Sequence, residues 1–187
     1  MKMNNMYKEK IAVFDLDDTL YIANSHIEIL CEYFNTNFYK SLLFKLIGKI
    51  FPKVERKLLY YFYNKIPQEV KENYLLNFNL EVVKILKDKQ EENYYILIIS
   101  NAPIELLTAA AHHLKVEYLE ALPCRKAEAL NRNYTYDYLF VCTDNKSDID
   151  LLEIADKSVI TCSKKNKKYF IKNLSRQNYT FLVNDNV

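Results

Sequence analysis

The chain has 187 residues, half of which are hydrophobic, and its formal net charge is +2. This length suits one domain with a small insert, and the charge gives no reason to expect a nucleic-acid partner. No apolar run approaches the roughly 20 residues that span a bilayer. The one glycine, Gly48, excludes the glycine-rich loops that commonly bind phosphate.

The cysteines and the first residues bear on location. Cys31, Cys124, Cys142 and Cys162 lie far apart and lack the spacing of metal-binding cysteines, so we expect them to be buried and reduced. Residues 1–10 are polar and do not have the pattern of a secretory signal. We therefore expect a cytoplasmic protein.

Short apolar runs alternate with helical patterns along most of the chain. The runs resemble buried strands and cover residues 11–14, 94–99, 116–119, 138–142, 158–162 and 179–183. Helical patterns occupy residues 80–87, 104–114, 126–130 and 147–154. This alternation predicts an α/β fold, a Rossmann-like parallel sheet with helices on both faces.

The stretch from residue 21 to residue 79 breaks the alternation. It has helical periodicity and many aromatic residues, and Pro52 and Pro67 are each expected to open a helix. We predict three or four helices that form a small inserted α-helical cap. The predicted organisation is a core of residues 1–20 and 80–187 with a cap of residues 21–79.

Acidic residues follow two of the predicted strands. Asp15 and Asp17 point to the same side if the backbone after the first strand stays extended. Asp144 and Asp148 share a face if the turn that holds them is helical. Ligands of such sheets bind beyond the strand ends, and crowded carboxylates require a cation or a shared proton. Mg²⁺ suits carboxylate ligands, so we expect this ion at the site.

In chain order, these residues resemble the four motifs of the haloacid dehalogenase-like (HAD) hydrolase superfamily. Asp15-Leu16-Asp17-Asp18-Thr19 is similar to the first motif, the apolar run ending in Ser100 to the second, Lys126 to the third, and Asp144-Asn145-Lys146-Ser147-Asp148 to the fourth. The resemblance covers most of the chain. The core is most similar to the phosphoserine-phosphatase-like subfamily, in which a helical cap follows the first motif.

The resemblance implies a role for each matching position. Asp15 would be the nucleophile that forms an aspartyl-phosphate, and Asp17 would transfer protons. The phosphate would be bound by Ser100, Asn101, Thr19 and Lys126, with Thr19 also holding the loop. Mg²⁺ would be held by Asp15, Asp17, Asp144 and Asp148. An acid at position 17 favours phosphate chemistry over the cleavage of carbon–halogen bonds.

Two positions and one short segment depart from the pattern of the family. Thr143 and Asp18 stand where many members have glycine, so the loop geometry could differ. Asn24-Ser25-His26 stands where phosphoserine phosphatases usually have a glutamate, which argues against phosphoserine as the substrate. For His26, both a structural role and a contact with substrate remain open.

We predict a phosphatase that hydrolyses the phosphomonoester of a small phosphorylated metabolite. One alternative is a lipid-phosphate phosphatase at a membrane surface, because residues 40–63 combine apolar residues with Lys45, Lys49 and Lys53. A second alternative is a regulator that keeps the HAD fold and binds a phosphorylated ligand without catalysis. The lysines at 164–168 predict a solvated helix start rather than a nucleic-acid site.

Overall fold

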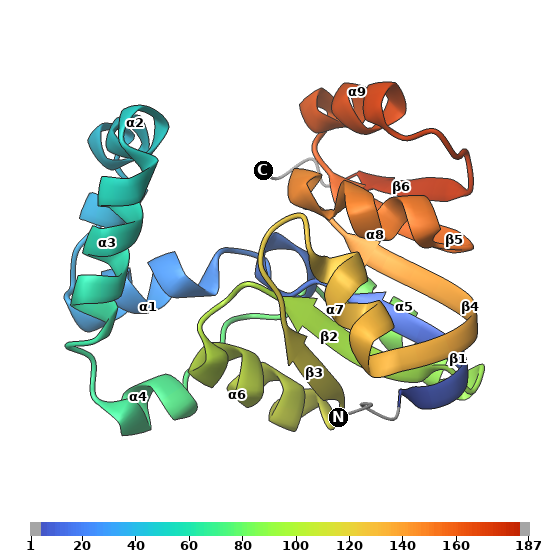
Figure 1. Ribbon diagram of the computed structural model, residues 1–187. Coiled ribbons are helices and arrows are strands. Elements are labelled where there is room, and N and C mark those ends of the chain that lie inside the picture. The colour runs from blue at the N-terminus through green and yellow to red at the C-terminus, as the bar shows by residue number, and fades with distance from the viewer. Residues whose placement is uncertain (1–4, 184–187) are drawn as a thin grey trace.

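The computed structural model describes residues 5–183, and a six-stranded parallel sheet forms the centre of this range (Figure 1). The strands are β1 (Met6–Phe14), β2 (Tyr95–Ser100), β3 (Glu117–Glu120), β4 (Tyr134–Thr143), β5 (Lys157–Cys162) and β6 (Tyr179–Val183). Their order in the sheet is β3-β2-β1-β4-β5-β6. The predicted Rossmann-like α/β class is thus confirmed.

Helices cover both faces of the sheet (Figure 1). One face packs against α5 (Leu80–Glu91) and α6 (Ile104–Leu114), and the other against α7 (Lys126–Asn133), α8 (Ile149–Ile154) and α9 (Lys164–Asn173). Along β1, Ile11 and Val13 join the cluster on one face, while Ala12 and Phe14 join the cluster on the other. A strand buried on both faces reads as a continuous apolar run.

The strands β1 and β4 are longer than their apolar runs predicted. Met6 pairs with Tyr134 and Tyr7 with Thr135, before the segment where the core begins. The side chain of Tyr7 is 60% exposed, so this part of the pair lies outside the apolar interior. Backbone pairing there needs no apolar sequence, and hydrophobic patterning therefore does not reveal it.

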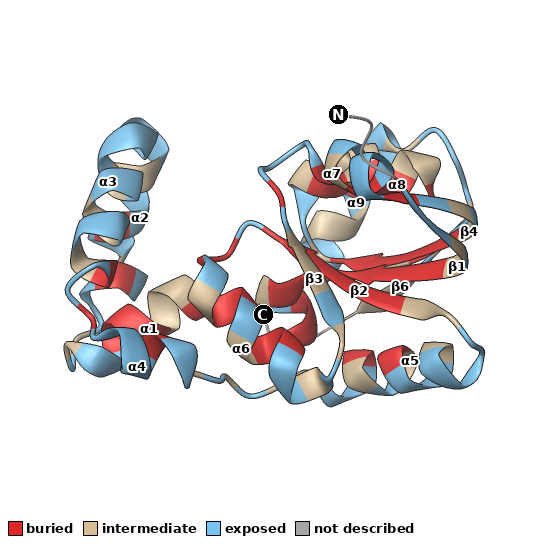
Figure 2. Ribbon diagram, turned by 60° about the horizontal axis from the view of Figure 1, so that its bottom comes forward, coloured by how far each residue is buried: buried red, intermediate tan, exposed pale blue. Residues whose placement is uncertain are grey.

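Residues 21–79, all of them described, form a short 3-10 helix, Phe38–Lys40, and four α-helices between β1 and β2. The α-helices are α1 (Ser25–Tyr33), α2 (Leu42–Ile50), α3 (Pro52–Tyr63) and α4 (Gln68–Glu72). They stand beside the sheet and enclose their own cluster of buried residues, which includes Ile29, Phe44 and Tyr63 (Figures 1 and 2). Leu106 of α6 belongs to the same cluster, so this helical insert, called the cap below, shares apolar contacts with the core.

The four cysteines are free. Three are buried, but the prediction of burial is wrong for Cys124, which is exposed in the turn before α7. Its φ of 59° lies in the left-handed region, as suits a tight turn outside the core. Over the described residues, no helix has the length and apolar character to cross a membrane.

Candidate active site

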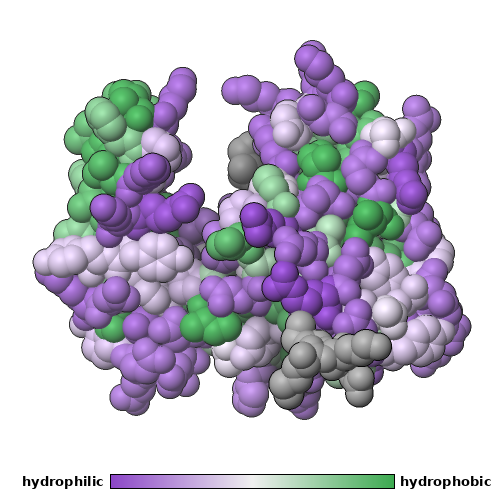
Figure 3. Space-filling model, in the orientation of Figure 1, coloured by the Kyte–Doolittle hydropathy of each residue, from purple (hydrophilic) through white to green (hydrophobic). Residues whose placement is uncertain are grey.

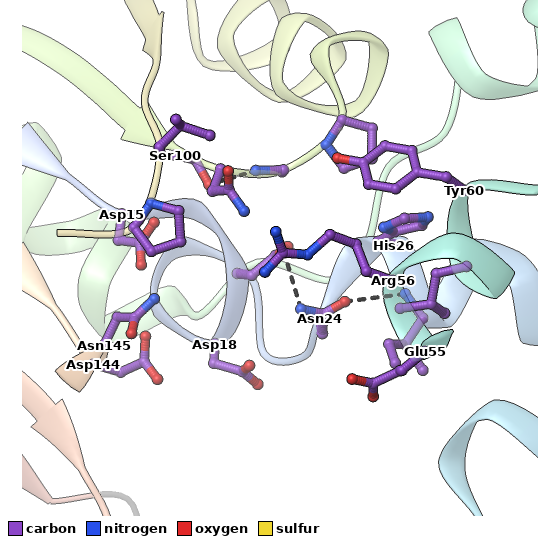
Figure 4. Close-up of a pocket in the computed structure, with 18 of the residues that line it drawn as sticks. Asp15, Asp18, Asn24, His26, Glu55, Arg56, Tyr60, Ser100, Asp144 and Asn145 are labelled. Carbon is purple, nitrogen blue, oxygen red and sulfur yellow. Dashed lines mark hydrogen bonds between the residues drawn. The ribbon is translucent and has the colours of Figure 1, made fainter. Parts of the chain in front are cut away.

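The carboxyl ends of β1, β2 and β4 are neighbours at one edge of the sheet, and they bring together most of the predicted site. A cavity of about 530 Å³ lies between this edge and the cap, and five predicted residues line it: Asp15, Asp17, Ser100, Asn101 and Asp144 (Figure 4). The other three, Thr19, Lys126 and Asp148, are buried beside it. Parallel sheets commonly bind ligands at this edge.

The loop Leu16–Leu20 sets the direction of the acids after β1. The amide of Asp15 donates to the carbonyl of Cys142 at 2.9 Å, which extends the pairing of β1 with β4. Asp17 is extended, with φ of −68° and ψ of 137°, whereas Asp18 is left-handed with φ of 57°. Glycine adopts this left-handed conformation most easily, and aspartate is among the few other residues that tolerate it. The chain therefore turns at Asp18 without a glycine.

Lys126 connects two strand ends through its ammonium group. Its Nζ lies 2.7 Å from Asp15 Oδ1 and 2.7 Å from Asp148 Oδ2, and its side chain is 2% exposed. Burial by itself would lower the pKa of Lys126, but the two carboxylates outweigh this effect and raise it. The lysine is therefore held as a cation in contact with Asp15.

Asp148 is part of this buried network. Its Oδ2 accepts hydrogen bonds of 2.7 Å from both Lys126 Nζ and the Thr143 hydroxyl. Burial and the charge of Asp15 raise the pKa of Asp148, although Lys126 and Thr143 oppose the shift. The contact of 2.7 Å with the Lys126 ammonium pairs Asp148 with this cation. Its assignment as a metal ligand stays a prediction, and its contacts favour a role in holding the lysine.

Thr19 fixes Asp144 in place. Its hydroxyl donates to Asp144 Oδ1 at 2.9 Å and accepts from the Asp144 amide at 2.9 Å. Thr19 is fully buried, and it is not among the residues that line the cavity. These contacts describe a residue that positions an acid, while its predicted contact with phosphate stays a prediction.

Asp17 is tied to the start of the cap. Its Oδ1 accepts from the Ser25 amide at 2.8 Å, and its Oδ2 accepts from the Asn24 side chain at 3.3 Å. Burial raises the pKa of Asp17 to about 7; hydrogen bonds from Ser25 oppose this shift, and the charges of Asp15 and Asp18 add to it. A carboxyl group with such a pKa can both give and take a proton near neutral pH.

The chemistry of these donors fits Mg²⁺. Burial, followed by repulsion from Asp15 and Asp18, raises the pKa of Asp144 to about 8, which shows how strongly the site opposes further negative charge. Between residues 5 and 183, no three His, Cys, Asp or Glu side chains are grouped as a ready-made metal cluster. Mg²⁺ does not need one, because it commonly binds one or two carboxylates together with water and substrate phosphate. The carboxylates of Asp15 and Asp144, which both line the cavity, are donors of the kind that Mg²⁺ prefers.

Ser100 ends β2 and faces the cavity beside Asn101. Its Oγ accepts a 3.2 Å hydrogen bond from the Ala102 amide, which leaves the hydroxyl proton available for an oxygen in the cavity. Helix α6 begins shortly after, at Ile104. Amide groups at the start of a helix have no partner within it and favour anions.

The cap supplies a second wall that sequence reasoning missed. Pro52, Glu55, Arg56, Leu59 and Tyr60 of α3 line the cavity opposite the strand ends. They recur at intervals of three to four residues, so the helical face they share was a usable signal. The orientation of this face toward the core could not be predicted from the sequence, because it depends on how the cap packs.

His26 of α1 lies next to this wall (Figure 4). Its ring meets Tyr60 and Tyr63 edge-on, with centroid distances of 5.4 and 4.8 Å. Within the described structure, its Nε2 is buried and has no hydrogen-bond partner. Burial lowers the pKa of His26 to about 4, against a hydrogen bond with the Leu59 backbone, so the ring is neutral at pH 7.

No family model and no curated protein matches this sequence. Among solved structures, a protein of unknown function from Bordetella pertussis Tohama I is similar over 94% of this chain and 98% of its own, with a TM-score of 0.63 and 10% identity. Phosphoserine phosphatase in apo form is similar over 90% of this chain and 100% of its own, with a TM-score of 0.58 and 12% identity. The chain therefore shares the fold of phosphoserine phosphatase.

Proposed function

We propose that this protein is a Mg²⁺-dependent phosphatase that hydrolyses a phosphomonoester through an aspartyl-phosphate on Asp15. One observation supports this most strongly: Asp15, buried at the end of the central strand, contacts Lys126 at 2.7 Å and faces a cavity that Asp17, Ser100 and Asp144 also line. A nucleophile, a proton carrier and an anion site thus adjoin one another.

In the first step, an oxygen of Asp15 attacks phosphorus as the bond from phosphorus to the leaving oxygen breaks. Asp17 gives its proton to that oxygen, so the product leaves as an alcohol. The Ser100 hydroxyl and the Asn101 backbone hold the phosphoryl oxygens, and Lys126 offsets their charge. This division of labour is typical of phosphoryl transfer, which depends on positioning and electrostatics.

In the second step, water attacks phosphorus and the bond to the Asp15 oxygen breaks. Asp17, now ionised, takes the proton from this water and is ready for the next cycle. Mg²⁺, when bound by Asp15, Asp144 and the Asp17 carbonyl, supplies positive charge that offsets the carboxylates and the phosphate. Asp148 keeps Lys126 in contact with the nucleophile.

We further propose that residues 21–79 act as a cap that selects a small phosphorylated metabolite. A cavity of about 530 Å³ falls within the usual range for small-molecule sites. Arg56 points from α3 into the cavity and, within the described structure, makes no ion pair or hydrogen bond (Figure 4). Its guanidinium group is suited to a second anionic group on the substrate.

The test replaces Asp15 by Asn and measures hydrolysis of para-nitrophenyl phosphate with Mg²⁺. We expect turnover to fall by at least about 10³-fold, because the amide is a poor nucleophile. Asp88, which is exposed on α5, gives the matched control Asp88→Asn with unchanged turnover. Acid-quenched wild-type protein should carry one added phosphoryl group by mass spectrometry. Undiminished turnover in Asp15→Asn would remove the assignment of Asp15 as the nucleophile. A separate screen of phosphorylated metabolites and lipids with the wild-type protein defines the substrate.

A further inference from the structure

Helix α2 carries a ridge of exposed apolar side chains at the outer end of the cap. Leu42, Leu43, Leu46 and Ile50 are 84%, 60%, 50% and 56% exposed, and they cover one side of the helix. Phe44 on the opposite side is buried in the cap cluster and anchors the helix. Figure 3 shows these hydrophobic groups gathered over α2. The ridge is therefore not needed for the packing of the cap.

Positive charge borders the ridge. Lys45 and Lys49 are exposed and flank its apolar side chains on α2, and Lys53 continues the row at the start of α3. The sequence of α2 contains no acidic residue. The nearby carboxylate of Glu55 packs against Gly48, on the other side of the helix from the ridge. The outer surface thus combines apolar side chains with positive charge alone.

This combination indicates what covers the ridge. A two-fold dimer through α2 would gather the lysines of both copies at one interface, where α2 has no acidic residue to offset their charge. An anionic lipid surface instead attracts the lysines and accepts the leucines among its acyl chains, as amphipathic interfacial helices do. Helix α9 lies toward the same end of the molecule as α2 (Figure 1). It carries the exposed lysines Lys165, Lys168 and Lys172.

We propose that the α2 ridge docks this protein onto an anionic lipid bilayer. Leu42, Leu46 and Ile50 enter the boundary between headgroups and acyl chains, while Lys45 and Lys49 remain at the level of the lipid phosphates. The contact is peripheral and reversible, because one short helix supplies it. It does not depend on whether the cavity hydrolyses a phosphate.

Vesicle co-sedimentation of the whole chain tests this directly. We expect binding to vesicles of phosphatidylcholine with phosphatidylglycerol, and at least about tenfold weaker binding to phosphatidylcholine alone, since roughly fivefold is expected per lysine at the surface. The double variant Leu42→Ser/Leu46→Ser should lose at least tenfold in affinity. Its matched control is Leu80→Ser on α5, where the side chain is 80% exposed but lies outside the ridge.

The charge component has its own pair of variants. Lys45→Gln/Lys49→Gln should weaken binding by about 20-fold at low salt and should reduce its dependence on salt. Lys84→Gln/Lys87→Gln, on the exposed side of α5, should leave binding unchanged. All variants should hydrolyse para-nitrophenyl phosphate like the wild type, which separates this proposal from the proposed function.

Three results would overturn the proposal. One is absence of binding to the anionic vesicles, and another is equal loss of binding in the control variants. The third is a dimer in gel filtration that Leu42→Ser/Leu46→Ser dissociates, since a second copy of the chain would then be what covers the ridge. Loss of lipid binding in the ridge variants, with circular dichroism unchanged, would support it.

Discussion

The hydroxyl of Tyr63 donates a 3.1 Å hydrogen bond to the carboxylate of Glu105, and this bond joins α3 of the cap to α6 of the core. Lys71 of α4 lies 3.4 Å from the other oxygen of the same carboxylate and packs over the Tyr63 ring. Burial alone would raise the pKa of Glu105, but its backbone amide, Lys71 and Tyr63 outweigh it and lower the pKa. An ionised Glu105 therefore holds the cap against the helix that follows Ser100 and Asn101.

Breaking this contact should loosen the cap. We expect Tyr63→Phe and Glu105→Gln each to lower the free energy of unfolding by about 1 kcal/mol, and the double variant to lose less than the sum. Because the cap forms one wall of the cavity, KM should rise more than kcat falls. Urea unfolding and steady-state kinetics measure both effects. Tyr61→Phe is the control, since this side chain is 57% exposed. If the losses of stability in Tyr63→Phe and Glu105→Gln add up in the double variant, the two residues are not coupled.

Lys126→Met should destabilise the protein by about 3–5 kcal/mol, since it leaves Asp15 and Asp148 buried without their shared cation. Adding Asp148→Asn should restore part of this stability, because one of the unpaired charges is then gone. Urea unfolding of the three proteins tests the prediction. Equal stability of Lys126→Met and Lys126→Met/Asp148→Asn would show that the unpaired charge of Asp148 does not destabilise the protein.

Asp18→Gly should stabilise the fold by about 0.5–1 kcal/mol, because glycine adopts a φ of 57° without strain. Asp18→Ala should be less stable than the glycine variant, since its Cβ meets the strain without a polar group to compensate. Thermal unfolding of the two variants gives the difference directly. The reverse order would mean that Asp18 is not held in the left-handed region.

The depressed pKa of His26 predicts how stability depends on acid. Because the folded state lowers this pKa from its usual 6.5 to about 4, the unfolded chain binds more protons between those values. The stability due to neutral His26 is complete above pH 6.5 and is lost as the pH falls toward 4. His26→Phe should reduce that loss by up to about 3 kcal/mol, at roughly 1.4 kcal/mol per pKa unit. Urea unfolding from pH 7 to pH 4 measures the difference, and parallel curves for the two proteins would refute it.

Asp144→Asn should raise the Mg²⁺ concentration needed for half-maximal activity by about tenfold or more, since it removes one of the proposed carboxylate ligands. Removal of the ion with a chelator should abolish hydrolysis in the wild type, and Mg²⁺ should restore it. Titration calorimetry with Mg²⁺ alone gives a readout independent of activity. An unchanged requirement in the variant would place the ion elsewhere.

The sequence predicted those parts of the structure that are both apolar and local. Residues 11–14 were recognisable as a strand because they are buried on both faces, whereas the pairing of Tyr7 with Thr135 carries no apolar signal. The same limit applies to the site. Asp15 and Asp144 could be named because they follow buried strands, but Arg56 and Glu105 owe their positions to how the cap packs on the core. Exposure of Leu42 likewise follows from tertiary packing, since the sequence pattern of an apolar helix face is the same whether that face is buried or exposed.

The central position of β1 has a consequence for synthesis on the ribosome. Both strands that pair with it come much later in the chain, β2 at Tyr95 and β4 at Tyr134. The cap helices, whose contacts are close in sequence, can form while β1 still has two open edges. Apolar strand edges invite pairing with other chains, so a nascent chain halted before residue 134 is prone to aggregate. The first strand to be synthesised is thus among the last to have both of its edges paired.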